Sequence, residues 1–123
     1  MRKIRESAEN YLETILVLQQ RNGSVRSIDI AAELEFSKPS VSVAMKNLRE
    51  KGCITVDGDG IISLTPEGRR IAEGVYERHI LFTQWLISLG VDPEVAAEDA
   101  CRIEHVISEE SFRAIQRHVG QQE

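Results

Sequence analysis

The sequence predicts a mainly α-helical protein with one small β-hairpin. Six segments carry helix start or stop signals, and the first of them shows an apolar stripe at helical spacing. Two short β-prone runs, 53–56 and 61–64, flank the turn sequence Asp57-Gly58-Asp59-Gly60, which is a strong hairpin signal. The 123 residues are 41% hydrophobic and 28% charged, as in ordinary globular chains.

The helix boundaries follow from capping residues. We expect Ser27 and Ser37 to cap the second and third helices, and Thr65 to cap the fourth, which Gly90 ends. Pro39 fits the first turn of the third helix because its missing N–H is not needed there. The first helix has its apolar stripe at Ala8, Leu12, Ile15 and Leu16. The predicted helices span residues 4–20, 28–34, 38–51, 66–89, 92–106 and 108–118.

The order of these elements is helix, helix, tight turn, helix and hairpin, followed by three helices. A helix-turn-helix with a β-hairpin behind it is the winged-helix arrangement, which commonly binds DNA. We therefore expect a winged-helix DNA-binding domain over residues 1–70 and a second helical domain over residues 71–123. The long fourth helix would belong to both.

The net charge of −5 does not argue against a DNA partner, because DNA interacts with the local face of a protein. Residues 37–51 carry four cations and one anion, whereas residues 92–123 carry eight acids and three arginines. The start of the third helix offers small polar donors, a cation and an apolar contact for a thymine methyl. The candidate DNA-binding residues are Arg26, Ser37, Lys38, Pro39, Ser40, Ser42 and Lys46.

A winged helix can also serve protein contacts, and the sequence pattern alone leaves that alternative open. The core face of the third helix is predicted to be Val41, Met45 and Leu48. Few residues are left to contact bases, and one such module buries little DNA surface. DNA binding by this chain therefore predicts a homodimer.

Potential metal ligands lie outside the DNA-binding residues. Cys101, Glu104 and His105 are spaced i, i+3 and i+4, which places them on one helical face. His79 lies on the fourth helix, and Asn10 and Glu13 share a face of the first. Mixed nitrogen, oxygen and sulfur donors suit a divalent transition metal. Taken singly, each residue also fits an ordinary surface or core position.

Four segments together resemble the diphtheria-toxin-repressor family, which includes iron-dependent repressors and manganese-transport regulators. These segments are Ser37-Lys38-Pro39-Ser40-Val41-Ser42, Leu64-Thr65-Pro66-Glu67-Gly68-Arg69, Val75-Tyr76-Glu77-Arg78-His79 and residues 100–108. The resemblance implies a winged helix-turn-helix followed by a helical dimerisation domain, in a short form without a C-terminal β-barrel domain. It also implies a metal-activated repressor of palindromic operators at metal-homeostasis genes.

The resemblance places the metal ligands on Asn10, Glu13, His79, Cys101, Glu104 and His105. Iron-type members carry methionine at the position of Asn10 and cysteine at that of Cys101, whereas manganese-type members carry aspartate and glutamate there and a glutamate at the position of Glu13. This chain combines both patterns, so we expect Fe²⁺ or Mn²⁺, with Zn²⁺ or Co²⁺ able to bind in vitro. Thr83 and Ala97 replace two ligands of the iron-type ancillary site, which we expect to be absent.

Two other functions remain open on the sequence. One is a winged-helix redox sensor that uses Cys101, and the other is a small metalloenzyme built on the same donors. We favour a non-enzymatic regulator, because no oxyanion loop or phosphate cradle is evident. We expect no membrane partner and no small organic substrate. The chain shows no signal peptide or membrane span, which predicts a cytoplasmic protein in which Cys53 and Cys101 stay free of disulfides.

Overall fold

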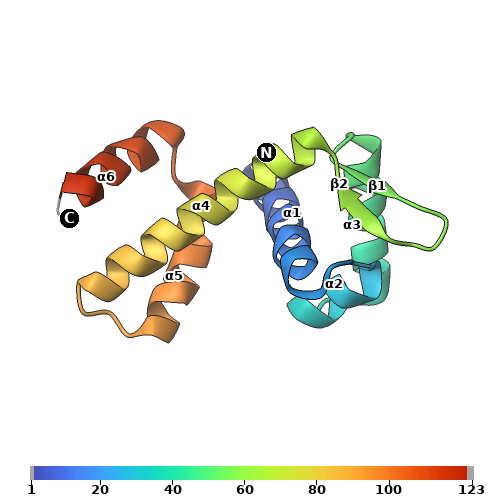
Figure 1. The fold of residues 1–123 in the computed structure, drawn as a ribbon, viewed down its shortest axis with the longest axis horizontal. Helices are drawn as coiled ribbons and strands as arrows, with labels where there is room; N and C mark the ends of the chain where they lie inside the picture. The colour runs from blue at the N-terminus through green and yellow to red at the C-terminus, as the bar shows by residue number, and fades with distance from the viewer. Residues whose placement is uncertain (1, 122–123) are drawn as a thin grey trace. The chain divides into compact units, whose positions relative to one another are not determined.

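The computed structural model describes residues 2–121, with side chains described from residue 6 onward. The chain forms two compact units, Lys3–Glu73 and Gly74–Glu123, called here the N-terminal and C-terminal units. Figure 1 labels the elements in chain order: α1 (Arg2–Asn22), α2 (Ser27–Leu34), α3 (Lys38–Glu50), β1 (Ile54–Val56), β2 (Ile62–Leu64), α4 (Pro66–Ser88), α5 (Pro93–Val106) and α6 (Glu109–Gln121). The predicted fold class, mainly α with one hairpin, is confirmed.

The core of the N-terminal unit is built from the predicted apolar faces of α1 and α3. Leu12, Ile15, Leu16, Val41, Met45 and Leu48 are all buried, and Ala8 is half-buried. Helix α2 adds Ile30 and Ala31 to the buried residues. Because these side chains recur at helical spacing, burying one stripe leaves the opposite face of α3 in solvent.

The capping predictions for α3 and α4 are confirmed, and the one for α2 is wrong. The Ser37 hydroxyl accepts a hydrogen bond from the Ser40 amide, and the Thr65 hydroxyl accepts one from the Gly68 amide. In α2, however, Ser27 is already helical and Arg26 occupies the N-cap position with an extended backbone. The Arg26 amide donates to the Asp29 carboxylate over 2.9 Å, so Asp29 supplies the capping hydrogen bond and Ser27 does not.

Strands β1 and β2 form an antiparallel hairpin in which Ile54 faces Leu64 and Val56 faces Ile62. Each strand begins one residue later than predicted. The Cys53 amide instead donates to the Leu48 carbonyl at the end of α3. The Ile61 carbonyl accepts from Asp57 inside the turn. The Cys53 amide and the Ile61 carbonyl thus bond to the end of α3 and to the turn, so neither residue is part of the paired strands.

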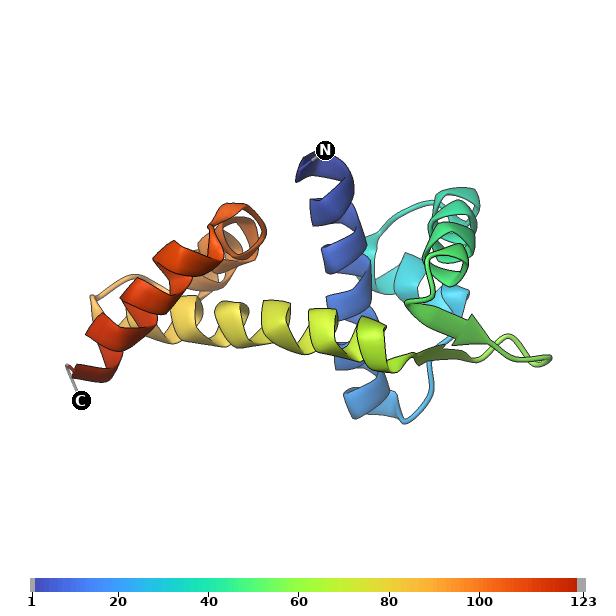
Figure 2. The same ribbon diagram turned by 90° about the horizontal axis from the view of Figure 1, so that it is seen from above.

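The C-terminal unit is a three-helix cluster. Helices α5 and α6 pack along the C-terminal half of α4 in both ribbon views (Figures 1 and 2). Phe82 of α4, Ala100 of α5 and Phe112 of α6 form its buried centre, and the two phenylalanine rings meet edge to face with centroids 5.9 Å apart. Among the described residues, no helix is long and apolar enough to span a membrane.

Candidate metal centre and nucleic-acid interface

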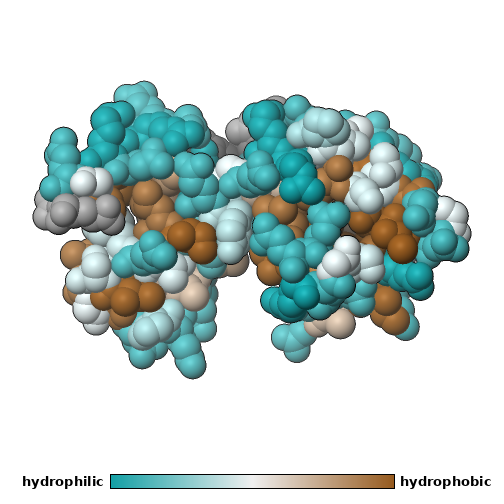
Figure 3. Space-filling model, viewed as in Figure 1, coloured by the Kyte–Doolittle hydropathy of each residue, from teal (hydrophilic) through white to brown (hydrophobic). Residues whose placement is uncertain are grey.

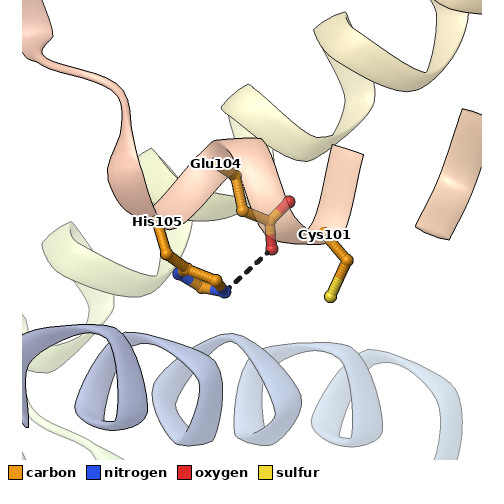
Figure 4. A group of neighbouring side chains, drawn as sticks. All are labelled: Cys101, Glu104 and His105. Carbon is orange, nitrogen blue, oxygen red and sulfur yellow. Dashed lines mark ion pairs between the residues drawn. The ribbon is translucent and has the colours of Figure 1, made fainter. Parts of the chain in front are cut away.

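Helix α5 gathers three potential metal ligands on one face. Cys101, Glu104 and His105 point to the same side of the helix (Figure 4), and one ligand atom from each lies within 4.8 Å of the others. Cys101 is exposed, whereas Glu104 is fully buried and His105 nearly so. The i, i+3, i+4 spacing alone predicts this shared face, because residues so spaced are neighbours on a helix surface.

His79 of α4 joins the same group. Its Nδ1 lies 2.8 Å from Oε2 of Glu104, although 25 residues separate them in the sequence. The pairing follows from the packing of α5 against α4 around Phe82 and Ala100. Four of the six predicted ligands are therefore together within the C-terminal unit.

The Glu104 carboxylate is the feature that best fits a cation. It is 0% exposed, and its Oε1 has no hydrogen-bond donor among the described residues. His105 Nε2 approaches Oε1 to 3.3 Å, within ion-pair range but without hydrogen-bond geometry. A buried carboxylate oxygen is costly unless a cation or donor compensates it. Imidazole, carboxylate and thiolate are also the donor types that first-row transition metals bind, so these residues fit such an ion.

The remaining predicted ligands lie on α1, in the N-terminal unit. Asn10 and Glu13 are three residues apart, and the backbone carbonyl of Asn10 accepts a hydrogen bond from the Thr14 hydroxyl over 2.8 Å. Their place in the metal centre stays a prediction from the sequence. The same holds for the absence of an ancillary site at Thr83 of α4 and Ala97 of α5.

All seven predicted DNA-binding residues are exposed: Arg26, Ser37, Lys38, Pro39, Ser40, Ser42 and Lys46. They lie at the start of α2 and along the outward face of α3, away from the buried Val41 stripe. The hydroxyl of Ser37 donates to Oγ of Ser40 over 2.8 Å while accepting from the Ser40 amide. The Ser37 hydroxyl thus acts as both donor and acceptor within the cap. The Ser40 hydroxyl only accepts there, so its proton is left to donate outward.

Val43 is an exposed residue of α3 that is not among the seven predicted DNA-binding residues. Its side chain is 61% exposed on the side of the helix opposite the Val41, Met45 and Leu48 stripe. An outward valine amid serines and Lys46 offers an apolar contact of the kind a thymine methyl accepts. Helical spacing also predicts this exposure, because residue 43 lies two positions from both Val41 and Met45 and so on the opposite side of the helix.

The tip of the wing, residues 57–60, is acidic, and its turn is closed by one side chain. Oδ1 of Asp57 accepts hydrogen bonds from the amides of Asp59 and Ile61, each over 2.9 Å. The carboxylate therefore closes the turn and Gly60 adopts a positive φ of 81°. A turn with two aspartates adds nothing to phosphate binding, so Arg26, which precedes α2, and the cations of α3 carry that role in the predicted interface.

Comparison with known proteins assigns both units to one family. Residues 3–60 match the family described as the iron dependent repressor N-terminal DNA binding domain. Residues 65–123 match the iron dependent repressor metal binding and dimerisation domain. Together the two matches span nearly the whole chain.

Individual relatives agree. The chain is 38% identical over 110 residues to transcriptional regulator MntR of Escherichia coli O157:H7, covering 89% of this chain and 71% of that protein. It is 33% identical over 116 residues to the diphtheria toxin repressor of Corynebacterium diphtheriae, covering 94% of this chain and 51% of the relative. A solved manganese-dependent transcriptional repressor in complex with manganese superposes with a TM-score of 0.84 at 27% identity, covering 92% of this chain and 52% of that one.

The chain thus spans about half the length of some relatives and 71% of MntR. The family is one of DNA-binding transcriptional repressors and not of enzymes, which agrees with the regulator predicted from the sequence. With a winged helix-turn-helix, a helical unit bearing clustered metal-binding side chains, and matches to both family domains, this chain belongs to the iron-dependent repressor family.

Proposed function

We propose that this protein is a cytoplasmic, metal-dependent transcriptional repressor that binds palindromic operators of metal-homeostasis genes as a homodimer. Residues 1–70 would bind the DNA, and residues 71–123 would bind the metal and dimerise. The observation that carries the proposal is the buried Glu104 carboxylate, with His79 and His105 beside it, in a chain that also holds a winged helix. Repressors of this kind depend on a cation to become competent for DNA, and these residues can hold one.

The proposed ligands are His79, Cys101, Glu104 and His105, with Asn10 and Glu13 of α1 completing the set. When bound, a divalent cation would supply the positive centre that neutralises the Glu104 carboxylate and joins the donors. The Cys101 sulfur is a softer donor than the carboxylates and favours Fe²⁺ over Mn²⁺, whereas Glu13 is typical of manganese-binding members. Fe²⁺ and Mn²⁺ are therefore the two proposed cofactors. Zn²⁺ and Co²⁺ would bind the same donors in vitro.

The chain's own residues supply the regulatory step. Ligands on α4 and α5 belong to the C-terminal unit, and those on α1 belong to the N-terminal unit. Holding both sets at one point would restrict the separations that the two α3 helices of a dimer sample. The protein then loses less conformational entropy when it binds DNA, so its DNA affinity rises. A coupling of about 1–3 kcal/mol is typical of such linkage and corresponds to roughly a 5- to 150-fold gain in DNA affinity.

The homodimer is supported by the family description of residues 65–123 and by apolar surface on the C-terminal unit. Ile80, Ile87, Leu89, Val95 and Val106 are 38–64% exposed there. Hydrophobic surface of this kind is visible on the face drawn in Figure 3. Five of the eight large hydrophobic side chains that are exposed among the described residues thus lie in this unit, and exposed apolar surface is typical of protein–protein interfaces.

The test is metal-stimulated DNA binding by the purified chain. Duplexes selected from a randomised pool with Mn²⁺ present serve as probes, and affinity is titrated at buffered free Mn²⁺, Fe²⁺, Co²⁺ or Zn²⁺. Glu104→Ala and His105→Ala are expected to abolish stimulation while the dimer persists in gel filtration. Glu98→Ala, an exposed acid of the same helix, is the matched control and should respond like the wild type. Undiminished stimulation in both ligand variants would reject the proposal.

The redox alternative also has an observation in its favour, since the Cys101 thiol is free of a disulfide and exposed. Cys101→Ser separates the two functions. A metal-dependent repressor should keep part of its metal response, since a hydroxyl replaces one ligand among several. A thiol switch should lose all regulation, and that result together with metal-independent DNA binding would replace the proposal.

A further inference from the structure

Arg78 of α4 precedes the proposed ligand His79 and makes four contacts inside the C-terminal unit. Its Nη1 donates to the carbonyls of Glu104 and Ile107, over 3.2 and 3.3 Å. Its Nη2 donates to Oε2 of Glu109 over 2.7 Å. The guanidinium also lies over the Phe112 ring, 5.3 Å from the centroid, and the side chain is only 17% exposed.

The two carbonyls are those that α5 cannot satisfy by itself. The last four carbonyls of a helix have no intrahelical N–H partner, and α5 ends at Val106 with Ile107 as its C-cap. Glu104 thus presents its carbonyl to a helix end. A guanidinium there both donates hydrogen bonds and complements the negative end of the helix dipole. Arg78 therefore fixes the turn of α5 that carries Glu104 and His105.

Two consecutive residues of α4 therefore contact Glu104, one at its backbone and one at its side chain. Arg78 binds its backbone carbonyl, and His79 Nδ1 contacts its carboxylate. We propose that Arg78 is a positioning residue of the metal centre, which sets cation affinity by fixing Glu104 and His105 relative to His79. This inference rests on the proposed function, because it assumes that these side chains bind a cation. Partners that orient metal ligands typically change metal affinity about 10- to 100-fold when removed.

Arg113 of α6 provides a matched control within the same cluster. Its Nε donates to Glu109 over 2.8 Å, and its guanidinium lies 5.2 Å from the Phe112 centroid, so it shares two partners with Arg78. Its other hydrogen bonds run to Glu77 and Gln116, on α4 and α6. A comparison of the two arginines therefore isolates the contact with the end of α5.

The experiment measures binding of Mn²⁺ and Co²⁺ to the whole chain, with Co²⁺ followed by its visible absorption. Arg78→Met is expected to weaken affinity about 10- to 100-fold and to change the shape of the Co²⁺ bands. Arg113→Met should stay within about 3-fold of the wild type and keep its band shape, because the ligand turn is untouched. Arg78→Lys should fall between them, since an ammonium keeps the charge but has no second nitrogen to bind Glu109 while it donates to the carbonyls. Equal affinities for Arg78→Met and Arg113→Met would overturn the inference.

Two measurements keep this outcome separate from folding and from the proposed function. Circular dichroism and thermal melting of the metal-free variants report whether each variant is folded. If Arg78→Met is not folded, the metal affinity of Arg78→Lys is the deciding measurement. A wild-type affinity in Arg78→Lys would then refute the inference. His105→Ala tests the proposed function in the same titration. If it binds metal like the wild type, the proposed centre is wrong. If it loses binding while Arg78→Met does not, only the positioning role fails.

Discussion

Gly68, in the first turn of α4, has no room for even one methyl group. A Cβ built there would lie 2.9 Å from the carbonyl carbon of Cys53 and closer still to its oxygen. The atoms in the way are backbone, and the Cys53 carbonyl accepts a hydrogen bond from Thr65 over 3.0 Å. Gly68→Ala must therefore move the junction between β1 and α4. Overpacking of this kind costs about 1–3 kcal/mol, and a weakened hydrogen bond adds about 1 kcal/mol.

Alanine also favours a helix over glycine by about 1 kcal/mol, which offsets part of that cost. The net expectation for Gly68→Ala is a loss of about 1–3 kcal/mol in the free energy of unfolding. Gly74 is the control, since it lies in the same helix and a Cβ there meets no heavy atom within 4 Å. Gly74→Ala should gain up to about 1 kcal/mol.

The assay is urea unfolding of the metal-free chain, followed by circular dichroism at equal protein concentration. The two alanine variants should shift the midpoint in opposite directions. A Gly68→Ala variant as stable as Gly74→Ala would refute the inferred close approach of α4 to Cys53.

Three further predictions concern packing, acid stability and DNA affinity. Phe112→Ala should cost about 3–5 kcal/mol in urea unfolding because this ring is buried at the centre of the C-terminal unit; a loss below about 1 kcal/mol would contradict that placement. The hydrogen bond from Arg78 holds the pKa of Glu109 below its usual value, so its contribution to stability is present above the carboxyl's ordinary range and is lost as pH falls through the folded pKa. Glu109→Gln should flatten the acid side of the stability-against-pH curve, and an unchanged curve would count against the ion pair. Lys46→Ala should weaken binding evenly across DNA sequences and lower the slope of log affinity against log salt by about 1, whereas an unchanged slope would remove Lys46 from the interface.

Much of the site was predictable because it depends on local spacing. Cys101, Glu104 and His105 share a face on any α-helix, so helix periodicity alone brings them together. The Val41, Met45 and Leu48 stripe likewise predicts which side of α3 packs inward. The capping of α3 by Ser37 was equally local, since a serine before a helix satisfies an amide of its own first turn.

Interactions that cross between helices could not be read from the chain. Two examples are the contact of His79 with Glu104 and the hydrogen bonds from Arg78 to the last carbonyls of α5. Each joins residues 25 or more positions apart. Which side chain caps α2 was also decided by backbone geometry, because Arg26 is extended and Asp29 can then reach its amide.

The amino-acid sequence by itself determined the order of the elements, the faces that α1 and α3 bury and the donor types available to a cation, because all three follow from residue type and periodicity. Only the tertiary structure decided which donors meet and how deeply Glu104 is buried. Packing of α4, α5 and α6 around Phe82 and Phe112 sets those distances, and no local rule contains them.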